Sequence, residues 1–130
     1  MSDTLQLVAG GDILPKRFIV ISAPNTVVQA SAATDKLLGI ADGDTEDFPQ
    51  EDSDLNHTKT GNFVSYKGSG KMTLVEAGAA FTAGDYITAD AQGRGVTATA
   101  GQVAGAIAIR DAAAAGEKVH VLVTDPFAAL

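Results

Sequence analysis

The stretch from Arg17 to Asp42 reads RFIVISAPNTVVQASAATDKLLGIAD, and the stretch from Asp85 to Ile109 reads DYITADAQGRGVTATAGQVAGAIAI. In both, runs of apolar residues alternate with turn residues such as Pro, Asn and Gly, which predicts three short strands in each stretch. Phe18 aligns with Tyr86 at an offset of 68 residues, and the later part of each stretch aligns after a two-residue shortening. The sequence therefore predicts an internal duplication, which is an architectural feature and not a catalytic one.

The composition predicts one domain with a thin core. A chain of 130 residues is long enough for a single domain that buries roughly two thirds of its unfolded surface. The hydrophobic 45% consists largely of small side chains, and Trp is absent. A core of small side chains is typical of a flat domain or of one that association stabilises. The absence of Cys excludes disulfides and thiolate zinc sites.

The net charge of −7 comes from one segment. Seven of the 16 acidic residues lie at positions 42, 44, 46, 47, 51, 52 and 54, and the other nine balance the nine Lys and Arg residues. Without a basic stripe we expect no nucleic-acid partner, because phosphate neutralisation needs clustered Lys and Arg. No run approaches the roughly 20 apolar residues of a membrane span, and residues 1–10 lack the basic start of a secretion signal. We therefore expect a soluble protein with no membrane partner that is not exported by that route.

The sequence predicts three parts. Residues 1–12 form an extended N-terminal arm, residues 13–125 form a single β domain, and residues 126–130 form an apolar C-terminal tail. Within the domain, residues 42–61 carry the acids and few large apolar side chains, which predicts a long loop at the solvent or at a subunit interface.

Short strands dominate the predicted domain. Runs with strand composition occur at 18–22, 27–30, 37–41, 62–66, 71–76, 86–89, 96–99, 103–110 and 118–123. Residues 62–66 and 71–76 are expected to pair as a hairpin, and Gly39 marks a bulge or a close approach of the backbone. The Ala-rich residues 77–81 and 111–115 each predict about one helical turn, closed by a Gly in the left-handed conformation. The fold class is therefore all-β, a compact β-sandwich or open barrel of about nine or ten short strands with minimal helix.

Patterns that suggest chemistry are incomplete. Residues 67–73, KGSGKMT, lack the first Gly and the final Ser or Thr of a phosphate-binding loop. The acids that begin at Asp42 have the first spacings of a calcium loop, but Asp47 stands at the required Gly and Ser53 at the required Glu. His120 lies in an alternating strand with no nucleophile motif beside it, which indicates an exposed or hydrogen-bonded strand residue. We therefore predict no catalytic residue, no metal site, no cofactor and no enzymatic activity.

Aromatic side chains are few and scattered through the predicted strands and strand entries. They are expected to lie in the core: Phe18, Phe63, Tyr66, Phe81 and Tyr86.

Several short motifs follow one another in a fixed order. They are LGIA at 38–41, FTAGD at 81–85, DAQG at 90–93, GQVAG at 101–105 and AGEKVHV at 115–121. In this order and spacing, from about Gly10 to Val123, the chain resembles the capsid decoration or cement proteins of tailed bacteriophages. The resemblance implies a β-tulip or barrel-like fold and homotrimers over three-fold positions of the capsid lattice. It also implies binding to the major capsid protein on the outer surface of the virion, with assembly in the host cytoplasm.

The expected function is to bind the exterior of the expanded head and to stabilise it against genome pressure. Candidate capsid or inter-subunit contacts are apolar residues of the arm, the acidic segment and the tail: Leu5, Leu7, Val8, Phe48, Phe127 and Leu130. The arm is expected to add a strand to a partner's open edge or to lie in a groove. The acidic segment is longer than the family pattern predicts at that point. The alternative function is that of an adhesive or carbohydrate-binding β-sandwich on a particle surface, although Trp is absent and only two Tyr could stack on sugars.

Overall fold

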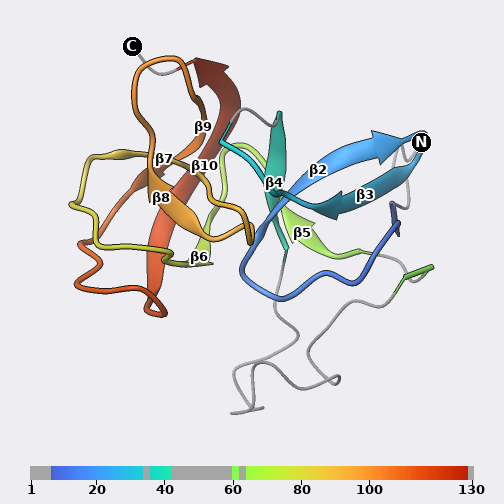
Figure 1. The fold of residues 1–130 in the computed structure, drawn as a ribbon, viewed down its shortest axis with the longest axis horizontal. Coiled ribbons are helices and arrows are strands. Elements are labelled where there is room, and N and C mark those ends of the chain that lie inside the picture. Colours follow the sequence, from blue (N-terminus) through green and yellow to red (C-terminus); the bar gives the residue numbers. More distant parts are fainter. Residues whose placement is uncertain (1–6, 34–35, 42–59, 62–63, 129–130) are drawn as a thin grey trace.

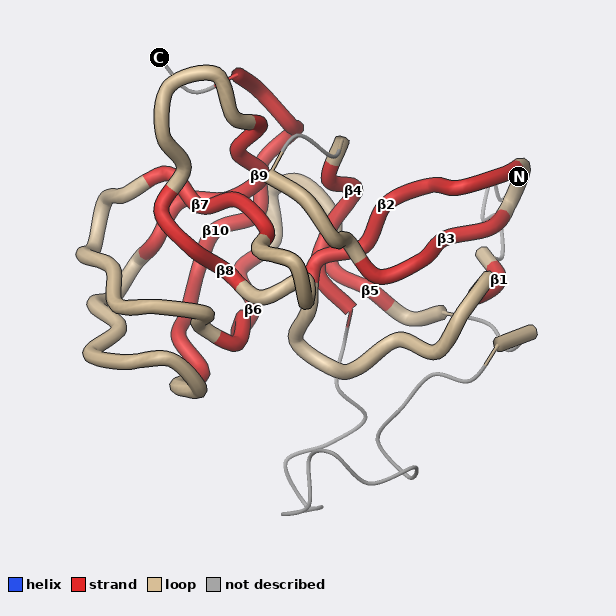
Figure 2. Tube along the Cα trace, viewed as in Figure 1, coloured by secondary structure: helices blue, strands red, loops and turns tan. Residues whose placement is uncertain are grey.

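All described secondary structure is β (Figure 1, Figure 2). The structure is a computed structural model that describes residues 7–33, 36–41, 60–61 and 64–128. Ten strands form two five-stranded sheets, and no α-helix or 3₁₀-helix occurs in these ranges. It follows that no helix in the described part of the chain is long and apolar enough to cross a membrane. The predicted all-β class is confirmed.

The first sheet lies in the N-terminal half of the chain. Its strands are β1 (Val8–Ala9), β2 (Phe18–Ala23), β3 (Thr26–Gln29), β4 (Leu37–Ala41) and β5 (Tyr66–Lys67), in the spatial order β1-β3-β2-β4-β5. Only the β1–β3 pair is parallel. Residues 8–9, which fall within the predicted arm, therefore belong to this sheet.

The second sheet is formed by the C-terminal half. Its strands are β6 (Met72–Glu76), β7 (Tyr86–Ala89), β8 (Gly95–Thr97), β9 (Val103–Ala108) and β10 (Lys118–Ala128), in the spatial order β6-β10-β9-β7-β8. All of its strand pairs are antiparallel. β10 is the longest strand and includes residues 126–128 of the predicted tail, past a register shift between Val123 and Phe127.

The duplication is visible in the strand pairing. The first unit (β2, β3, β4) has the order β3-β2-β4, and the second unit (β7, β8, β9) has the order β8-β7-β9. Ile19 pairs with Gln29 in the first unit, and the residues 68 positions further on, Ile87 and Thr97, also pair. In both units the first strand is therefore central, between its hairpin partner and the third strand, and the two units share the register of this hairpin.

Each sheet curls on itself. In the second sheet, a bridge between Ala77 and Gly95 joins the residue after β6 to the start of β8, which are the two edges of the sheet. In the first sheet, the Val64 amide donates to the Leu7 carbonyl (2.8 Å) and links β1 to the segment that leads into β5. The result is a pair of partly closed barrels that lie side by side (Figure 1).

Two apolar clusters fill the fold. The larger one lies between the sheets and combines the second sheet's inner face with side chains of the first unit: Phe18, Ala30, Leu37, Ile40, Val75, Ala77, Phe81, Ile87, Ala89, Ala106, Ala108, Ala112, Val119, Val121 and Val123. The smaller one lies on the opposite face of the first sheet: Ala9, Ile13, Ile19, Val27, Ala41 and Val64. Because β2 contributes Phe18 to the larger cluster and Ile19 to the smaller one, the start of this strand is buried on both faces, whereas residues 21–23 are exposed.

The predicted hairpin of residues 62–66 and 71–76 is wrong. β5 pairs with β4 in the first sheet, whereas β6 pairs with β10 in the second sheet, so the chain crosses between sheets at the Gly-Ser-Gly turn. Residues 62–63 lie outside the described part. The two β strands are sequence neighbours, but their apolar side chains belong to different cores, and burial decides the pairing.

The two predicted helical turns are also wrong. The Ala-rich segments instead meet through an antiparallel bridge between Phe81 and Ala112, with hydrogen bonds of 3.1 and 2.9 Å. These two hydrogen bonds satisfy backbone N–H and C=O groups that a helical turn would otherwise have to pair. The Gly residues expected to follow in the left-handed conformation do so, with φ of 92° at Gly84 and 94° at Gly116.

Gly39 occupies a close approach, as predicted. A Cβ at Gly39 would fall onto the carbonyl oxygen of Lys67 in β5. Only a residue without a side chain lets β5 pack against β4 at this point.

Candidate functional site

The outer face of the second sheet carries a continuous row of apolar residues. Met72 of β6 pairs with Leu122 of β10, Leu122 pairs with Ile107 of β9, and Ile107 pairs with Tyr86 of β7. Directly paired residues on antiparallel strands have side chains on the same face. These four residues, the apolar row, therefore cross four strands on one side of the sheet.

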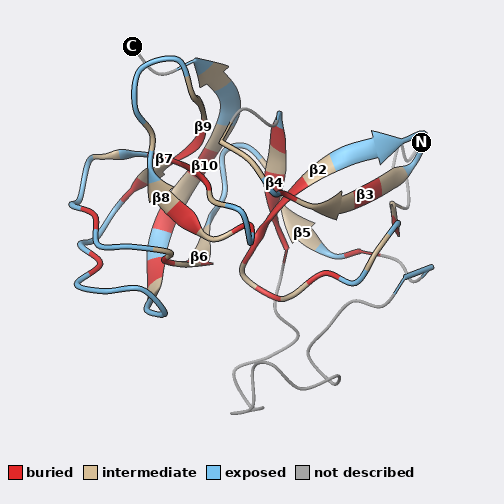
Figure 3. Cartoon of the chain, in the orientation of Figure 1, coloured by how far each residue is buried: buried red, intermediate tan, exposed pale blue. Residues whose placement is uncertain are grey.

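The row faces solvent because the alternate residues face the core. Val121, Ala106 and Ile87 are completely buried in the larger cluster. Their neighbours point the opposite way, as the two-residue period of a strand requires. Met72 is 65% exposed and Tyr86 46% exposed, while Leu122 and Ile107 are half-buried. Figure 3 colours the exposed parts of β7, β9 and β10 and of their loops pale blue and the half-buried parts tan.

Further apolar side chains extend the row. The Phe127 ring meets the Tyr86 ring edge to face, with centroids 5.0 Å apart and an interplanar angle of 88°. Leu74 is half-buried and pairs with His120 one step along β6, and Ile109 is 41% exposed at the end of β9. We call the four residues of the row together with Leu74, Ile109 and Phe127 the outer apolar face. Contiguous exposed apolar residues of this kind mark interaction surfaces in soluble proteins.

The expectation that the aromatic residues lie in the core holds only in part. Phe18 and Phe81 are buried and Tyr66 is half-buried. Tyr86 is exposed, so its prediction is wrong, while Phe63 lies outside the described residues. The reason is the face on which each residue lies: the first unit packs Phe18 against the second sheet, and no described element covers the equivalent position at Tyr86.

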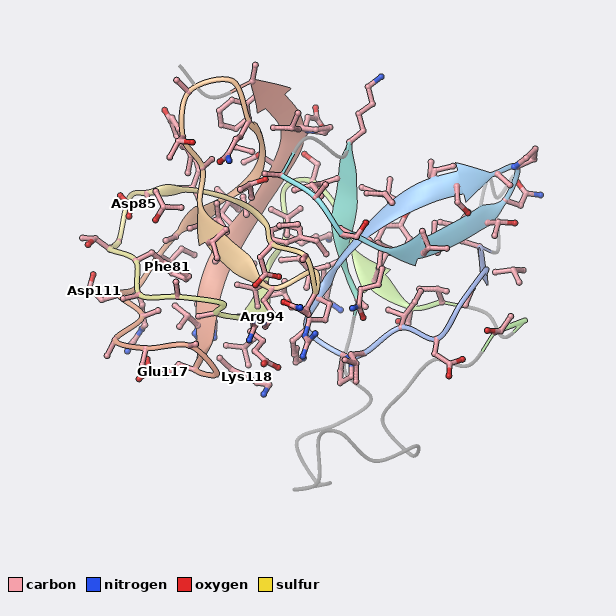
Figure 4. The ribbon with its side chains drawn as sticks, viewed as in Figure 1. Phe81, Asp85, Arg94, Asp111, Glu117 and Lys118 are labelled. Carbon is pink, nitrogen blue, oxygen red and sulfur yellow. The ribbon has the colours of Figure 1, made fainter. Side chains whose placement is uncertain are left out.

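Two acidic residues lie beyond the Tyr86 end of the row and hold its neighbouring loops. Asp85 accepts hydrogen bonds from the Thr82 amide (3.0 Å) and the Thr97 hydroxyl (3.3 Å). Asp111 accepts one from the Ala83 amide (2.8 Å), which ties the two loops together near Phe81 (Figure 4). Asp85 stands opposite the buried Ala108, as Lys71 stands opposite the buried Val123, so both charged residues start on the core side of the sheet and not in the apolar row.

The joint between the two sheets is polar. Arg17 is almost fully buried, and it donates to the Gln92 carbonyl (2.9 Å) and to the Glu76 carboxylate (3.2 Å). Lys118 approaches the same carboxylate at 3.7 Å, and Gln29 donates to the Gln92 carbonyl at 2.8 Å. The two bonds to the Gln92 carbonyl hold the β7–β8 turn against the first sheet, and the Arg17–Glu76 bond joins the start of β2 to β6. The cluster therefore has a structural role.

A cleft opens between the first sheet and the bulged part of β10. It has a volume of about 380 Å³ and mostly apolar walls: Ile21, Leu37, Leu38, Tyr66, Gly68, Ser69 and Pro126, with Lys36 and Asp125. Its charged groups are one Lys and one Asp. No group of three or more His, Cys, Asp or Glu side chains able to hold a metal occurs in the ranges that the structure describes.

The candidate contact residues fall in different places. Leu7 is half-buried and packs on the smaller cluster, and Val8 is half-buried in β1, so both contribute to the first sheet. Phe127 belongs to the outer apolar face. Leu5, Phe48 and Leu130 lie outside the described residues, as do positions 42–59 of the acidic segment. His120 is exposed, as expected.

Comparison with known proteins identifies the family. A model of the phage cement protein family matches residues 2–123, while no curated protein sequence matches the chain. Among solved structures, the chain is similar to the N base of head fiber gp8.5 of bacteriophage phi29, with a TM-score of 0.65 and 16% sequence identity. The alignment covers 96% of this chain and 94% of that one, so the two share a fold. The chain therefore belongs to the phage cement protein family and is a capsid-associated structural protein.

Proposed function

We propose that the protein binds the outer surface of the expanded phage head at three-fold lattice positions and strengthens the shell against the pressure of the packaged genome. Its partners would be the major capsid protein and further copies of itself in a cyclic trimer. The observation that carries the proposal is the family match over residues 2–123. The outer apolar face adds a surface suited to protein contacts.

The physical basis of the stabilisation is multivalency. A trimer that contacts several capsid subunits at once makes the second and third contacts intramolecular, so separating the subunits requires several contacts to break together. A three-fold position is matched by a cyclic trimer, whereas a two-fold dimer would leave one site unmatched. Clamping of this kind needs no chemical step, and we propose a role without catalysis.

Attachment is tested by co-sedimentation of the purified protein with heads assembled from the major capsid protein of the same phage. We expect binding to expanded heads, and greater retention of packaged DNA when decorated heads are heated than when bare heads are heated. Equal DNA retention would contradict the stabilising role. Failure to bind expanded heads, together with specific binding on a glycan array, would favour the adhesive alternative.

The N-terminal arm needs a shorter deletion than residues 1–10, because β1 begins at Val8. Removing residues 1–6 leaves the strand in place. We expect weaker retention on heads with an unchanged melting temperature, and full retention would contradict a role for the arm.

A further inference from the structure

We propose that the cleft between the first sheet and the bulged part of β10 binds residues 2–6 of a second copy of this chain, with Leu5 in its apolar part. The inference deepens the proposed function and rests on it, because it names a contact that would join copies into the trimer. It is drawn from the walls of the cleft, from the place where the chain enters the first sheet, and from the strand pattern of the residues before that place.

The cleft is an apolar site that opens beside the outer half of β2. Its volume of about 380 Å³ lies at the lower end of the range for binding pockets, and its walls are mostly apolar. Ile21 lines it and is 60% exposed, although Ile19, on the same side of β2, is completely buried. β4 begins at Leu37, which pairs with Val20, so residues 21–23 extend past this strand towards the tip of the hairpin (Figure 1). Among the described residues, no strand covers Ile21 on that side.

The residues before β1 carry a strand pattern that fits this site. Residues 2–9 read SDTLQLVA, in which Asp, the two Leu and Ala alternate with Ser, Thr, Gln and Val. Leu7 packs on the smaller cluster, so an extended continuation of the strand places Leu5 on the same side. Asp3 stands at the next alternate position and is the only charged side chain of the stretch. An apolar residue with an acid two positions before it matches a cleft that combines apolar walls with the exposed Lys36.

The position of β1 directs these residues away from the cleft of their own copy. The Val8 amide donates to the Asn25 carbonyl at 2.8 Å, so Leu7 lies beside the tip of the β2–β3 hairpin. In the sheet, β3 and β2 separate β1 from β4, at whose start the cleft lies. Entry into that cleft requires the chain to turn back directly before Leu7, and residues 2–6 contain no Gly or Pro to form such a turn. An extended segment therefore reaches the cleft of another molecule.

This exchange supplies both halves of a ring contact. Every copy gives one segment and offers one cleft, which is a heterologous contact, and such a contact closes into a ring when the rotation between copies allows it. Once two contacts of a trimer have formed, the third is intramolecular. A segment of the shell could enter the cleft only by presenting the same pattern, whereas this chain carries the pattern and the cleft together.

Cross-linking tests the assignment directly, because the chain has no Cys and introduced thiols are the only ones. Thr4→Cys lies next to Leu5 in the sequence, and Ser69→Cys lies at the wall of the cleft, where Ser69 is exposed. The two single variants are mixed and treated with a short bifunctional thiol reagent, in solution and on heads, and mass spectrometry identifies the 4–69 link. Ala114→Cys replaces Ser69→Cys as the matched control, because Ala114 is exposed in the loop before β10. We expect at least about tenfold more linked product with Ser69→Cys, since a bound segment has a high effective concentration at its site.

Variants of the segment measure the contact by light scattering over a range of concentrations. We expect the wild type to reach the mass of three chains. Leu5→Asp should weaken association by about tenfold or more, as for loss of a buried interface side chain. Gln6→Asp is the matched control, because it adds the same charge on the alternate side of the strand, and it should weaken association by less than about threefold.

A second pair of variants examines the charges. Lys36→Glu should weaken association, and adding Asp3→Lys should recover part of the loss, because the pair is restored with its signs exchanged. Circular dichroism melting verifies that the variants fold. Absence of recovery would contradict the placement of Asp3 beside Lys36.

Other outcomes separate this inference from the proposed function. In the double variant, a 4–69 link within one chain would place the segment in its own cleft and overturn the inference, as would the absence of any link both in solution and on heads. If heads shield Ser69→Cys from the reagent while no copies are linked, the shell occupies the cleft, which overturns the assignment and leaves the proposed function standing. If copies are linked as expected but no version binds heads, the proposed function fails and the contact between copies remains.

Discussion

The two three-strand units share a strand order and a hairpin register, yet their equivalent aromatic residues differ: Phe18 is completely buried and Tyr86 is 46% exposed. The second sheet covers one face of the first unit, and residues 7–13 with Val64 cover the other. In the second unit the inner face lies in the core, and the outer face is covered only in part: Leu37 lies against Gly105 and the Thr88 hydroxyl donates to the Ala33 carbonyl, whereas Tyr86 is exposed. The difference shows that a strand pattern determines pairing, whereas the elements that pack over the strands determine which positions reach water.

The sharpest test of this comparison is to shorten the equivalent aromatic residues. Phe18→Ala should lower the free energy of unfolding by about 3–5 kcal/mol, because a fully buried ring leaves a cavity. Tyr86→Ala should cost only about 0.5–1.5 kcal/mol, the contribution of its ring contact with Phe127. Urea unfolding measures both values. Similar losses of stability at the two positions would contradict the finding that Phe18 is buried and Tyr86 is exposed.

The aligned glycines of the two units offer the next largest contrast. Gly39→Ala would push a methyl group into the Lys67 carbonyl, and we expect a loss of about 2–3 kcal/mol, since overpacking against backbone relaxes poorly. At Gly105 the new methyl group would meet the Leu37 side chain. The contact involves the Cβ as well as the Cδ1 of the buried Leu37, so part of the side chain can adjust and part cannot, and we expect a loss of about 1–2 kcal/mol. Hydrogen exchange in β5 should rise for the first variant only; equal protection in both would argue against a specific clash.

Breaking the joint between the units should have an intermediate effect. Arg17→Met removes the bonds to Gln92 and Glu76, and we expect a loss of about 2 kcal/mol, which is less than for an isolated buried pair because Lys118 still approaches Glu76. Arg17→Lys keeps the charge and serves as the conservative control. Thermal melting followed by circular dichroism gives the difference, and an unchanged midpoint for Arg17→Met would show that the joint is held by apolar contacts alone.

The smallest effects are expected at the hairpin turns. Gly93 in the second unit has φ of 78° and little space for a Cβ beside Gln29, so Gly93→Ala should cost about 1–2 kcal/mol. Asn25 in the first unit already adopts φ of 59°, and Asn25→Gly should change stability by about 0.5 kcal/mol or less. Denaturant midpoints distinguish the two turns. A large loss for Asn25→Gly would mean that its side chain contributes more than its backbone conformation.

Local pairing could be predicted from the sequence, and long-range pairing could not. The β2–β3 and β7–β8 hairpins follow from turn residues and alternation because their two strands are neighbours in the chain. The β2–β4 and β7–β9 pairs join strands that are separated by a third. The hairpin at 62–76 failed because alternation indicates a strand without indicating its partner. For Ala77–Phe81, Ala-rich composition suggested helix, but a bridge to Ala112 satisfies the backbone instead.

The candidate site illustrates the same limit. Phe127 stands out in the sequence as an apolar residue of the predicted tail, whereas Met72 and Leu122 look like ordinary members of alternating strands. Only the register between four strands shows that they share a solvent-facing side with Tyr86. A signal was present in the alignment of the copies, where a buried Phe18 corresponds to a more polar Tyr86.

The bridge between Ala77 and Gly95 has a consequence for solubility. Open sheet edges present unpaired backbone groups that recruit strands from other molecules and start aggregates. Here the Gly78 amide donates to the Gly95 carbonyl (2.8 Å), and the Glu76 amide donates to the Lys16 carbonyl (2.9 Å), so backbone groups at both margins of the second sheet are already occupied. On a shell crowded with identical neighbours, this closure would favour side-chain contacts over uncontrolled strand exchange.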